Sequence, residues 1–273
     1  MPELKIQKAL AAPIFFLILV SATQVFAQQY HVIPVTKGGT ISGTAKWTGP
    51  KPHLARFPIT KDPQICDPNS EKTRDLERLI IGPQGGVANT VVYIKEISAG
   101  KEFDFPPTRR FLDQRHCRYE PHILLVPAGG TLDMKSSDST LHTLHMEGAA
   151  SYNLPFPFPN QVISRSLPTA GLVHLKCNGG HVWMNAEMFV ARHPYYAVTD
   201  EEGKFELTNV PPGQYLLMAW HEGWEIAKEE QTFDVLTEKR VPRPIFGDPK
   251  TLEKKVTVSP SDTAVVEFDL SDK

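Results

Sequence analysis

Short apolar segments separated by turn-forming residues run through most of the chain. The segments are rich in valine, isoleucine, leucine and threonine, and they cover residues 39–48, 87–97, 122–127, 131–136, 141–146, 162–167, 172–177 and 186–192. Clusters of glycine and proline bound many of them, as is typical of turns. Short strands at this spacing are typical of a β-sandwich or a barrel. The pattern therefore predicts an all-β protein.

A second pattern begins near residue 195. Three strand-like segments between residues 195 and 221 are separated by the turn sequences DEEG and NVPPG, which predicts a compact β-meander. In residues 265–270, apolar side chains alternate with acidic ones, as in a strand with one buried face. We therefore expect two β-domains that pack together, a first one over residues 28–194 and a smaller one over residues 195–273.

Proline interrupts the strand pattern in two places. Residues 154–159 read LPFPFP, and three prolines exclude a central strand because proline lacks the backbone donor that a strand needs on both sides. We expect an ordered loop there. Residues 239–253 also contain three prolines and are expected to form a surface loop. Weak periodicity over residues 71–79 predicts a helical turn.

The N-terminus has the pattern of a signal peptide over residues 1–27. Lys5 and Lys8 precede an apolar run over residues 9–20, and the small residue Ala27 marks the expected cleavage point. An uncleaved anchor is the alternative, although the run is shorter than the roughly 20 residues of a membrane span. We expect a periplasmic or secreted protein with no membrane span after cleavage.

Composition narrows the classes of function. The formal net charge of −2 gives no reason to expect nucleic acid as a partner. The chain has no Cys-x-x-Cys-His for covalent haem, no Gly-x-Ser-x-Gly nucleophile motif and no His-x-His pair of the kind that copper oxidases need. We therefore expect that the protein is not an enzyme.

Residues 177–184, CNGGHVWM, carry the candidate chemistry. The alternation of the preceding strand places Cys177 on its apolar face, and the two glycines allow the chain to turn back tightly. His181 and Met184 can then approach the sulfur of Cys177 from the same loop. A thiolate, an imidazole and a thioether suit copper better than zinc or iron. The plainer alternative is a buried thiol, with Met184 as core filler.

The remaining ligand must come from another strand. His142 and His145 lie three apart, so on a strand they face opposite sides. His142 shares its face with Leu144 and Met146 and is the favoured ligand, with His145 as the alternative. A second metal site near His221 at the domain junction is conceivable, but interdomain packing is favoured there.

The cysteine count is odd. Three cysteines in an exported chain divide most simply into one disulfide and one special thiol. Since Cys177 has a role as a ligand, Cys66 and Cys117 are the expected pair in an oxidising compartment. The alternative is that both are reduced and buried.

The order D-x-x-x-H over residues 138–142, followed by C-x-x-x-H-x-x-M over residues 177–184, resembles the cupredoxin family of plastocyanin- and amicyanin-like copper proteins. The resemblance implies a Greek-key β-sandwich that holds one type 1-like copper ion. It also implies that the strong ligands are His142, Cys177 and His181, with Met184 as the weak axial ligand.

The resemblance extends to exported proteins labelled methylamine-utilisation or plastocyanin-like, in which a carboxypeptidase-regulatory-like, transthyretin-like β-domain follows. One departure is that relatives usually have two residues between the cysteine and the histidine, whereas this chain has three. The longer spacing is similar to the binuclear copper loop of cytochrome oxidase. That loop needs a second cysteine where this chain has Val173.

Two functions follow as hypotheses. The first is periplasmic electron transfer by a mononuclear copper protein, with a redox partner such as a cytochrome or a membrane-bound respiratory complex. The second is a non-enzymatic binding or scaffold subunit of an exported complex, in which the copper site is degenerate or structural.

Overall fold

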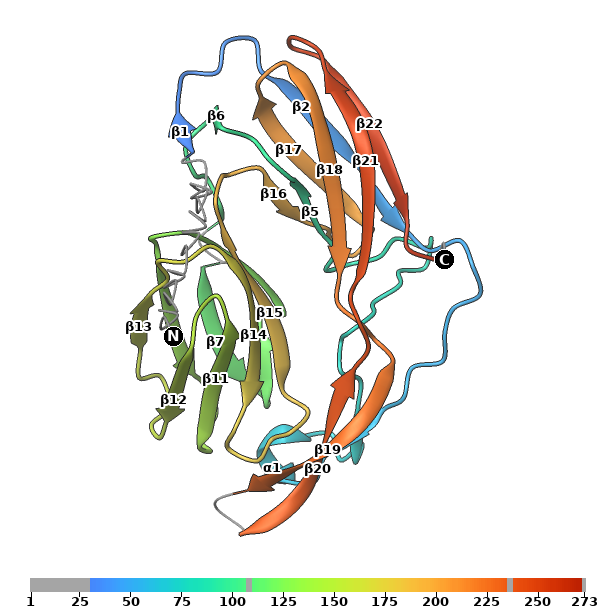
Figure 1. Cartoon of the computed structure of the whole chain (residues 1–273). Coiled ribbons are helices and arrows are strands. Elements are labelled where there is room, and N and C mark those ends of the chain that lie inside the picture. The colour runs from blue at the N-terminus through green and yellow to red at the C-terminus, as the bar shows by residue number, and fades with distance from the viewer. Residues whose placement is uncertain (1–29, 107–109, 235–237, 272–273) are drawn as a thin grey trace, which may run out of the picture.

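The structure, a computed structural model, describes residues 30–106, 110–234 and 238–271 (Figure 1). The expected signal peptide, residues 1–27, lies outside this part. The described chain is all-β apart from the four-residue helix α1 (Pro63–Cys66). No helix within these residues is long and apolar enough to cross a membrane.

The first sandwich consists of two facing sheets. The smaller sheet has the strand order β13 (Ile163–Ser166), β10 (Thr131–Ser136), β7 (Phe111–Arg115), β8 (Arg118–Glu120). The larger sheet has the order β12 (Tyr152–Phe156), β11 (His142–Gly148), β14 (Gly171–Cys177), β15 (Asn185–Ala191), β9 (Ile123–Pro127). Each sheet contains one parallel pair, β10 with β7 and β15 with β9. The all-β prediction is confirmed.

The second sandwich combines strands from both ends of the chain. One sheet has the order β16 (Tyr196–Val198), β5 (Val91–Ile94), β18 (Gly213–His221), β21 (Lys250–Val258). The other has the order β17 (Lys204–Val210), β2 (Gly39–Lys46), β22 (Thr263–Asp269). The expected division at residue 195 assigns β2 and β5 to the first domain, but both strands are hydrogen-bonded into the second sandwich.

Three two-stranded sheets complete the fold. They are β1 (His31–Val32) with β6 (Ala99–Gly100), β3 (Phe57–Pro58) with β4 (Thr73–Arg74), and β19 (Ile226–Asp234) with β20 (Lys239–Phe246). The β19–β20 hairpin continues from β18 and β21 and reaches the end of the first sandwich where α1 lies (Figure 1).

Three local expectations were wrong in whole or in part, and the two that rested on proline failed for the same reason. Residues 154–159 form no central strand, as expected, but residues 154–156 lie in the edge strand β12 rather than in a loop. Residues 239–253 are not a surface loop, since they form β20 and the start of β21. Pro155 lies in β12, and Pro242 and Pro244 lie in β20. Each of these strands has a neighbour on one side only, so a proline without a donor is tolerated. The helical turn expected over residues 71–79 is absent, and β4 occupies part of that range.

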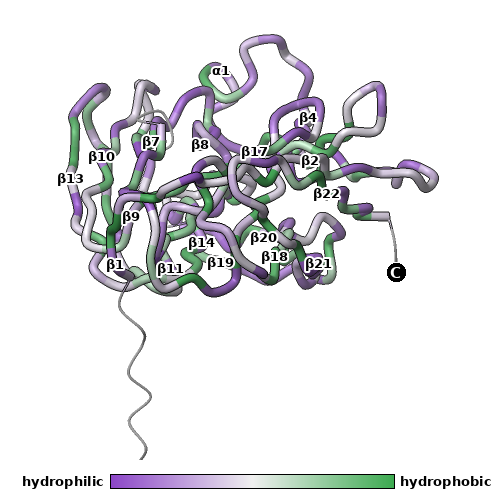
Figure 2. Tube along the Cα trace, turned by 90° about the horizontal axis from the view of Figure 1, so that it is seen from above, coloured by the Kyte–Doolittle hydropathy of each residue, from purple (hydrophilic) through white to green (hydrophobic). Residues whose placement is uncertain are grey.

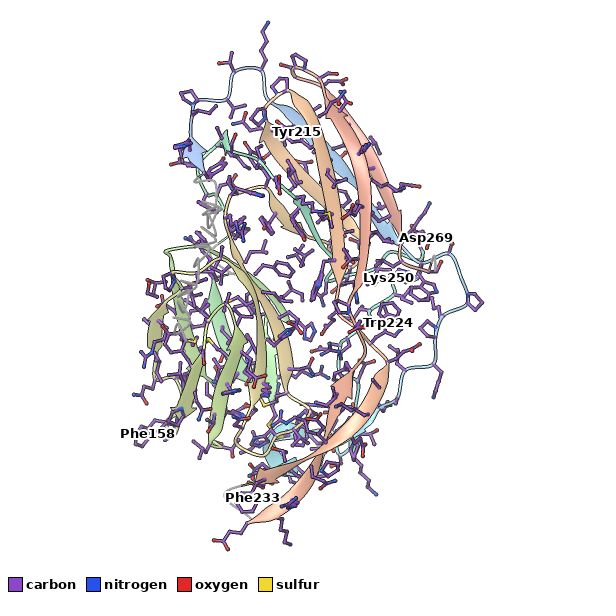
Figure 3. The ribbon with its side chains drawn as sticks, viewed as in Figure 1. Phe158, Tyr215, Trp224, Phe233, Lys250 and Asp269 are labelled. Atoms are coloured by element: carbon purple, nitrogen blue, oxygen red, sulfur yellow. A yellow bond between two sulfur atoms is a disulfide. The ribbon has the colours of Figure 1, made fainter. Side chains whose placement is uncertain are left out.

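Each sandwich has its own apolar core, and a third cluster joins them. Hydrophobic stretches follow the strands, while the outer loops are largely hydrophilic (Figure 2). Side chains of two facing sheets, the one that contains β9 and β15 and the one that contains β5 and β18, fill the space between the sandwiches (Figure 3). The joining cluster contains buried residues from β5, β9, β15 and β18, among them Val91, Leu125, Phe189 and Trp220. Burial of this kind holds the two sandwiches together.

A buried ionic network lies beside this apolar interface. The Arg78 guanidinium is 2.7 Å from the Glu222 carboxylate and 4.0 Å from that of Glu187. His122 contacts the same Glu222 carboxylate. Arg78 also donates to the carbonyl of Gly223 over 2.6 Å. Glu222 therefore pairs with Arg78 and His122, and Nδ1 of His221 donates to the Glu222 carbonyl over 2.9 Å, in agreement with interdomain packing.

Candidate metal centre

The register of β11 and β14 brings the first two predicted ligands together. Leu144 of β11 lies opposite Cys177, the last residue of β14, so His142 stands at the same end of the sheet. The chain then turns through Gly180, whose φ of +92° favours glycine. After this turn, the Met184 amide donates to the carbonyl of His181 over 3.0 Å, and β15 begins.

Three donor atoms converge in the interior at this point. The Sγ atom of Cys177 is 3.9 Å from Nδ1 of His142 and 3.9 Å from Nδ1 of His181, and the two nitrogens are 3.2 Å apart. The three side chains are fully buried. These atoms are one of the few sets in the described chain that lie close enough together to hold a metal ion.

The spacing of the donors fits a metal ion. A triangle with sides of 3.2, 3.9 and 3.9 Å has a centre about 2.1 Å from each corner, and metal–nitrogen and metal–sulfur bonds in protein zinc sites are about 2.0–2.3 Å long. Cys177, His142 and His181 could therefore hold one metal ion together without movement of the chain. A trigonal His2Cys set of this kind, with a weak axial methionine, is the arrangement of blue-copper sites.

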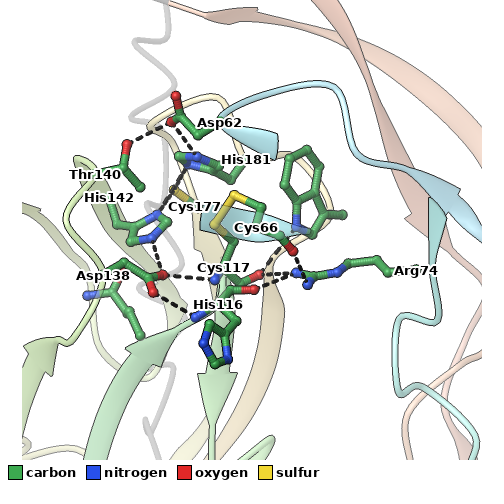
Figure 4. The surroundings of a disulfide bond; sticks show 12 residues. Asp62, Cys66, Arg74, His116, Cys117, Asp138, Thr140, His142, Cys177 and His181 are labelled. Atoms are coloured by element: carbon green, nitrogen blue, oxygen red, sulfur yellow. Dashed lines mark hydrogen bonds and ion pairs between the residues drawn. A yellow bond between two sulfur atoms is a disulfide. The ribbon is translucent and has the colours of Figure 1, made fainter. Parts of the chain in front are cut away.

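Both histidines are fixed by a carboxylate on their far side (Figure 4). Nε2 of His142 is 2.9 Å from Asp138, and Nε2 of His181 is 3.0 Å from Asp62. Asp138 also accepts from the amides of His116 and Cys117 over 2.7 and 2.8 Å. A hydrogen bond at Nε2 orients the ring and leaves Nδ1 free for a metal.

The electrostatics of the site favour a thiolate. Burial alone would raise the pKa of the Cys177 thiol, but hydrogen bonds from His142 and His181 hold this pKa well below its usual range. Burial lowers the pKa of His142, while Asp138 and Cys177 raise it more strongly, to about 9. In the metal-free protein, a thiolate therefore faces an imidazolium, and a soft cation that binds here would displace the proton on Nδ1 of His142.

The structure also places the other residues that were predicted for the site, namely Met184, the alternative ligand His145 and the two remaining cysteines. Met184 is buried in the same apolar cluster as Cys177. His145 lies on the opposite face of β11, where its Nε2 pairs with Glu147 over 2.9 Å. His142 is thus in the cluster and His145 is not. The disulfide between Cys66 and Cys117 is confirmed.

Sequence reasoning missed the groups that surround the site. Asp62 precedes a proline and a short helix, a pattern that suggests a helix cap, yet its side chain makes no capping bond and turns to His181 instead. Arg243 of β20 donates to the carbonyl of Cys177 over 2.6 Å. Lys61 and Asp234 form an ion pair of 2.9 Å beside Gly180. None of these contacts has a local sequence signal.

Known proteins resemble parts of the chain. The family described as "BOS complex subunit NOMO1-like, second beta sandwich domain" matches residues 191–244. No curated protein matches the chain.

Solved copper proteins resemble about a third of the chain. The copper-containing nitrite reductase NirK of Thermus scotoductus SA-01 is 14% identical with a TM-score of 0.28, over 36% of this chain and 25% of that one. The reduced Cu(I) form at pH 4 of an amicyanin variant is 24% identical with a TM-score of 0.27, over 30% of this chain and 80% of that one.

A second amicyanin, a reduced tryptophan-to-tyrosine variant, is 20% identical with a TM-score of 0.28, over 37% of this chain and 98% of that one. This chain therefore spans nearly the whole of that amicyanin but only a quarter of the nitrite reductase. The described part of this chain forms two β-sandwiches. The fit of the site to copper rests on the donor geometry described above.

Proposed function

We propose that the protein is an exported, mononuclear, type 1-like copper protein that transfers single electrons. The observation that supports this proposal most strongly is the buried triangle of Cys177 and two histidine Nδ1 atoms, whose centre is at bonding distance from all three. Cys177, His142 and His181 would hold the ion, with Met184 as the axial ligand. When bound, copper would supply a one-electron couple.

The surroundings of the donors suit electron transfer better than substrate chemistry. The three donors are fully buried, and both imidazoles are held from behind by carboxylates. Such a rigid site offers copper nearly the same surroundings in both oxidation states. We therefore propose that the protein is not an enzyme.

Optical and paramagnetic-resonance spectra of the copper-loaded protein test this function. Wild type should bind one copper ion and show an intense thiolate charge-transfer band, which Cys177→Ser should abolish. His142→Gln should lose the band, and His145→Gln, its neighbour on the outer face, should retain it. A copper-loaded wild type with no thiolate band would refute the proposal.

The axial position has its own control. Met184→Leu should shift the reduction potential while copper stays bound, because the axial ligand tunes this potential. Met188→Leu removes a buried thioether from the neighbouring strand β15 and should leave the potential unchanged. Equal potentials in both variants would show that Met184 is not the axial ligand.

The partner would be a redox protein, such as a cytochrome or a membrane-bound respiratory complex, in the periplasm or outside the cell. The pattern of residues 1–27 supports this compartment. Phe158 and Phe233 are 66% and 54% exposed at the end of the molecule that holds the metal centre (Figure 3). Exposed aromatic side chains of this kind are enriched where proteins dock.

The second candidate is a scaffold subunit with a structural copper site. It is supported by the match of residues 191–244 to a domain of a complex subunit and by the complete burial of His181. Titration with ascorbate and then ferricyanide separates the two functions. Reversible uptake and release of one electron per copper supports electron transfer, whereas copper that stays in one oxidation state supports a scaffold.

A further inference from the structure

One segment covers the metal centre from outside the first sandwich. We call residues 57–74 the lid, which runs from β3 through α1 to β4. Two of the contacts that join the lid to the rest of the protein lie close together. The Cys66–Cys117 disulfide fixes its helix, and the ion pair of Lys61 with Asp234 fixes it to the β19–β20 hairpin. Asp62 lies between these two ties.

The backbone of Asp62 is held in an unusual conformation. Its φ and ψ of 46° and 47° are left-handed, a region that residues other than glycine enter rarely. Asp62 is the residue that precedes α1, where an aspartate normally caps the helix with its side chain. Here its side chain makes no capping bond. The carboxylate is directed to the metal centre instead of to its own helix.

The Asp62 carboxylate meets two donors there. Its Oδ2 atom accepts from Nε2 of His181 over 3.0 Å and from the Thr140 hydroxyl over 2.7 Å. His181 is fully buried beneath it. A ring that donates from Nε2 to Asp62 is oriented with its Nδ1 atom towards Cys177 and the metal centre.

The disulfide links the two carboxylates that hold the histidines (Figure 4). The Cys66 amide donates to the carbonyl of Asp62 over 2.9 Å. On the other side of the disulfide, the Cys117 amide donates to Asp138, which in turn holds His142. The disulfide sulfurs also lie within 4.8 Å of a ring nitrogen of His181. A frame of one disulfide and these hydrogen bonds therefore lies behind both imidazoles.

We propose that Asp62 is a positioning residue that fixes His181 for the metal and closes the metal centre, an inference that rests on the proposed copper function. The carboxylate sets the tautomer and the orientation of the ring. Its negative charge stabilises the more positive Cu(II) state relative to Cu(I). The lid that carries it keeps solvent and chelators away from His181.

Two substitutions separate the charge from the closure. Asp62→Asn keeps an acceptor of similar shape but removes the charge, and it should weaken Cu(II) binding by about 10–100-fold. If this loss affects Cu(II) alone, each tenfold raises the reduction potential by about 59 mV. Asp62→Ala should in addition speed the removal of copper by a chelator such as bathocuproine under reducing conditions.

The matched control is Asp75→Asn. It also removes one aspartate charge from the N-terminal part of the chain, but Asp75 is exposed and accepts a hydrogen bond from the nearby Glu77 amide rather than from a histidine of the site. Its potential, Cu(II) affinity and copper-release rate should equal those of wild type. If both Asp62 variants match Asp75→Asn in all three measurements, the proposal is overturned. The urea midpoint of metal-free Asp62→Asn should equal that of wild type. A lower midpoint would show that the substitution destabilises the whole protein rather than the position of His181.

A measurement on the metal-free protein keeps this proposal distinct from the copper function. Imidazole nitrogen chemical shifts of ¹⁵N-histidine-labelled protein should show His181 with its hydrogen on Nε2 in wild type and in Asp75→Asn. This preference should be lost in Asp62→Ala. A His181 ring whose shifts are the same in all three proteins would overturn the positioning role. A missing thiolate band in wild type would overturn the copper function alone.

Discussion

Gly180 offers a direct test of how tightly the lid and the hairpin close over the metal loop. A Cβ atom at this position would lie 2.6 Å from Nζ of Lys61 and 2.8 Å from Cγ of Asp234. These two groups form the ion pair that joins the lid to the hairpin. Gly180→Ala should therefore push apart the two segments that cover His181.

The magnitude of the Gly180→Ala effect has two parts. The φ of +92° is strained for alanine, which costs about 1–2 kcal/mol. Overpacking against the Lys61–Asp234 pair should add about 1–3 kcal/mol. Gly129 is a matched control, because its φ is +81° and a Cβ there would meet nothing within 4 Å. Gly129→Ala should thus lose only the stability that backbone strain costs, about 1–2 kcal/mol.

Urea unfolding of the metal-free variants measures this difference. The free energy of unfolding should fall further in Gly180→Ala than in Gly129→Ala, by about 1–3 kcal/mol. A chelator should also remove copper faster from Gly180→Ala, since the closed cover is displaced. Equal losses of stability in the two variants would refute the close contact between the lid, the hairpin and the metal loop.

Three further predictions concern the supports of the site and of the interface. In the metal-free protein, the free energy of unfolding should rise with pH from 5 to about 6.5. Burial raises the pKa of Cys177, but the hydrogen bonds from the histidines hold this pKa well below its usual range, so the unfolded chain binds one more proton than the folded chain. Cys177→Ser should remove about 1.4 kcal/mol per pH unit of this slope in urea unfolding. Replacing Cys66 and Cys117 by serine opens a loop with a sequence separation of 51 and should cost about 4 kcal/mol, measured in the same way. Arg78→Met leaves Glu222 and Glu187 buried with less positive charge and should cost about 3–5 kcal/mol by thermal unfolding, whereas adding Glu222→Gln should restore part of that loss.

The centre of the metal site could be predicted because its geometry follows from local periodicity. The two-residue repeat of a strand places Cys177 on the apolar face of β14, and it separates His142 from His145 across β11. The structure shows this arrangement, with His142 buried and His145 on the outer face. These inferences needed only the neighbours of each residue in the chain.

The supports of the site could not be predicted because they depend on contacts between distant segments. Asp62 and His181 are 119 residues apart, and no local pattern links them. The same limit explains β2, whose apolar alternation predicts a strand but not that its parallel partner is β22, near the C-terminus. Side-chain alternation specifies a buried face, whereas strand partners are selected by the packing of the whole sandwich.

Three separate parts of the chain complete the metal centre. The first sandwich provides the donors, the lid provides Asp62, and the β19–β20 hairpin provides Arg243, which holds the carbonyl of Cys177 over 2.6 Å. Because the hairpin continues from β18 and β21, the second sandwich is joined directly to the strand end that carries Cys177. A shift of the second sandwich against the first would therefore move Arg243 and change the surroundings of the Cys177 thiolate. Through this contact, the second sandwich is a structural component of the candidate metal centre.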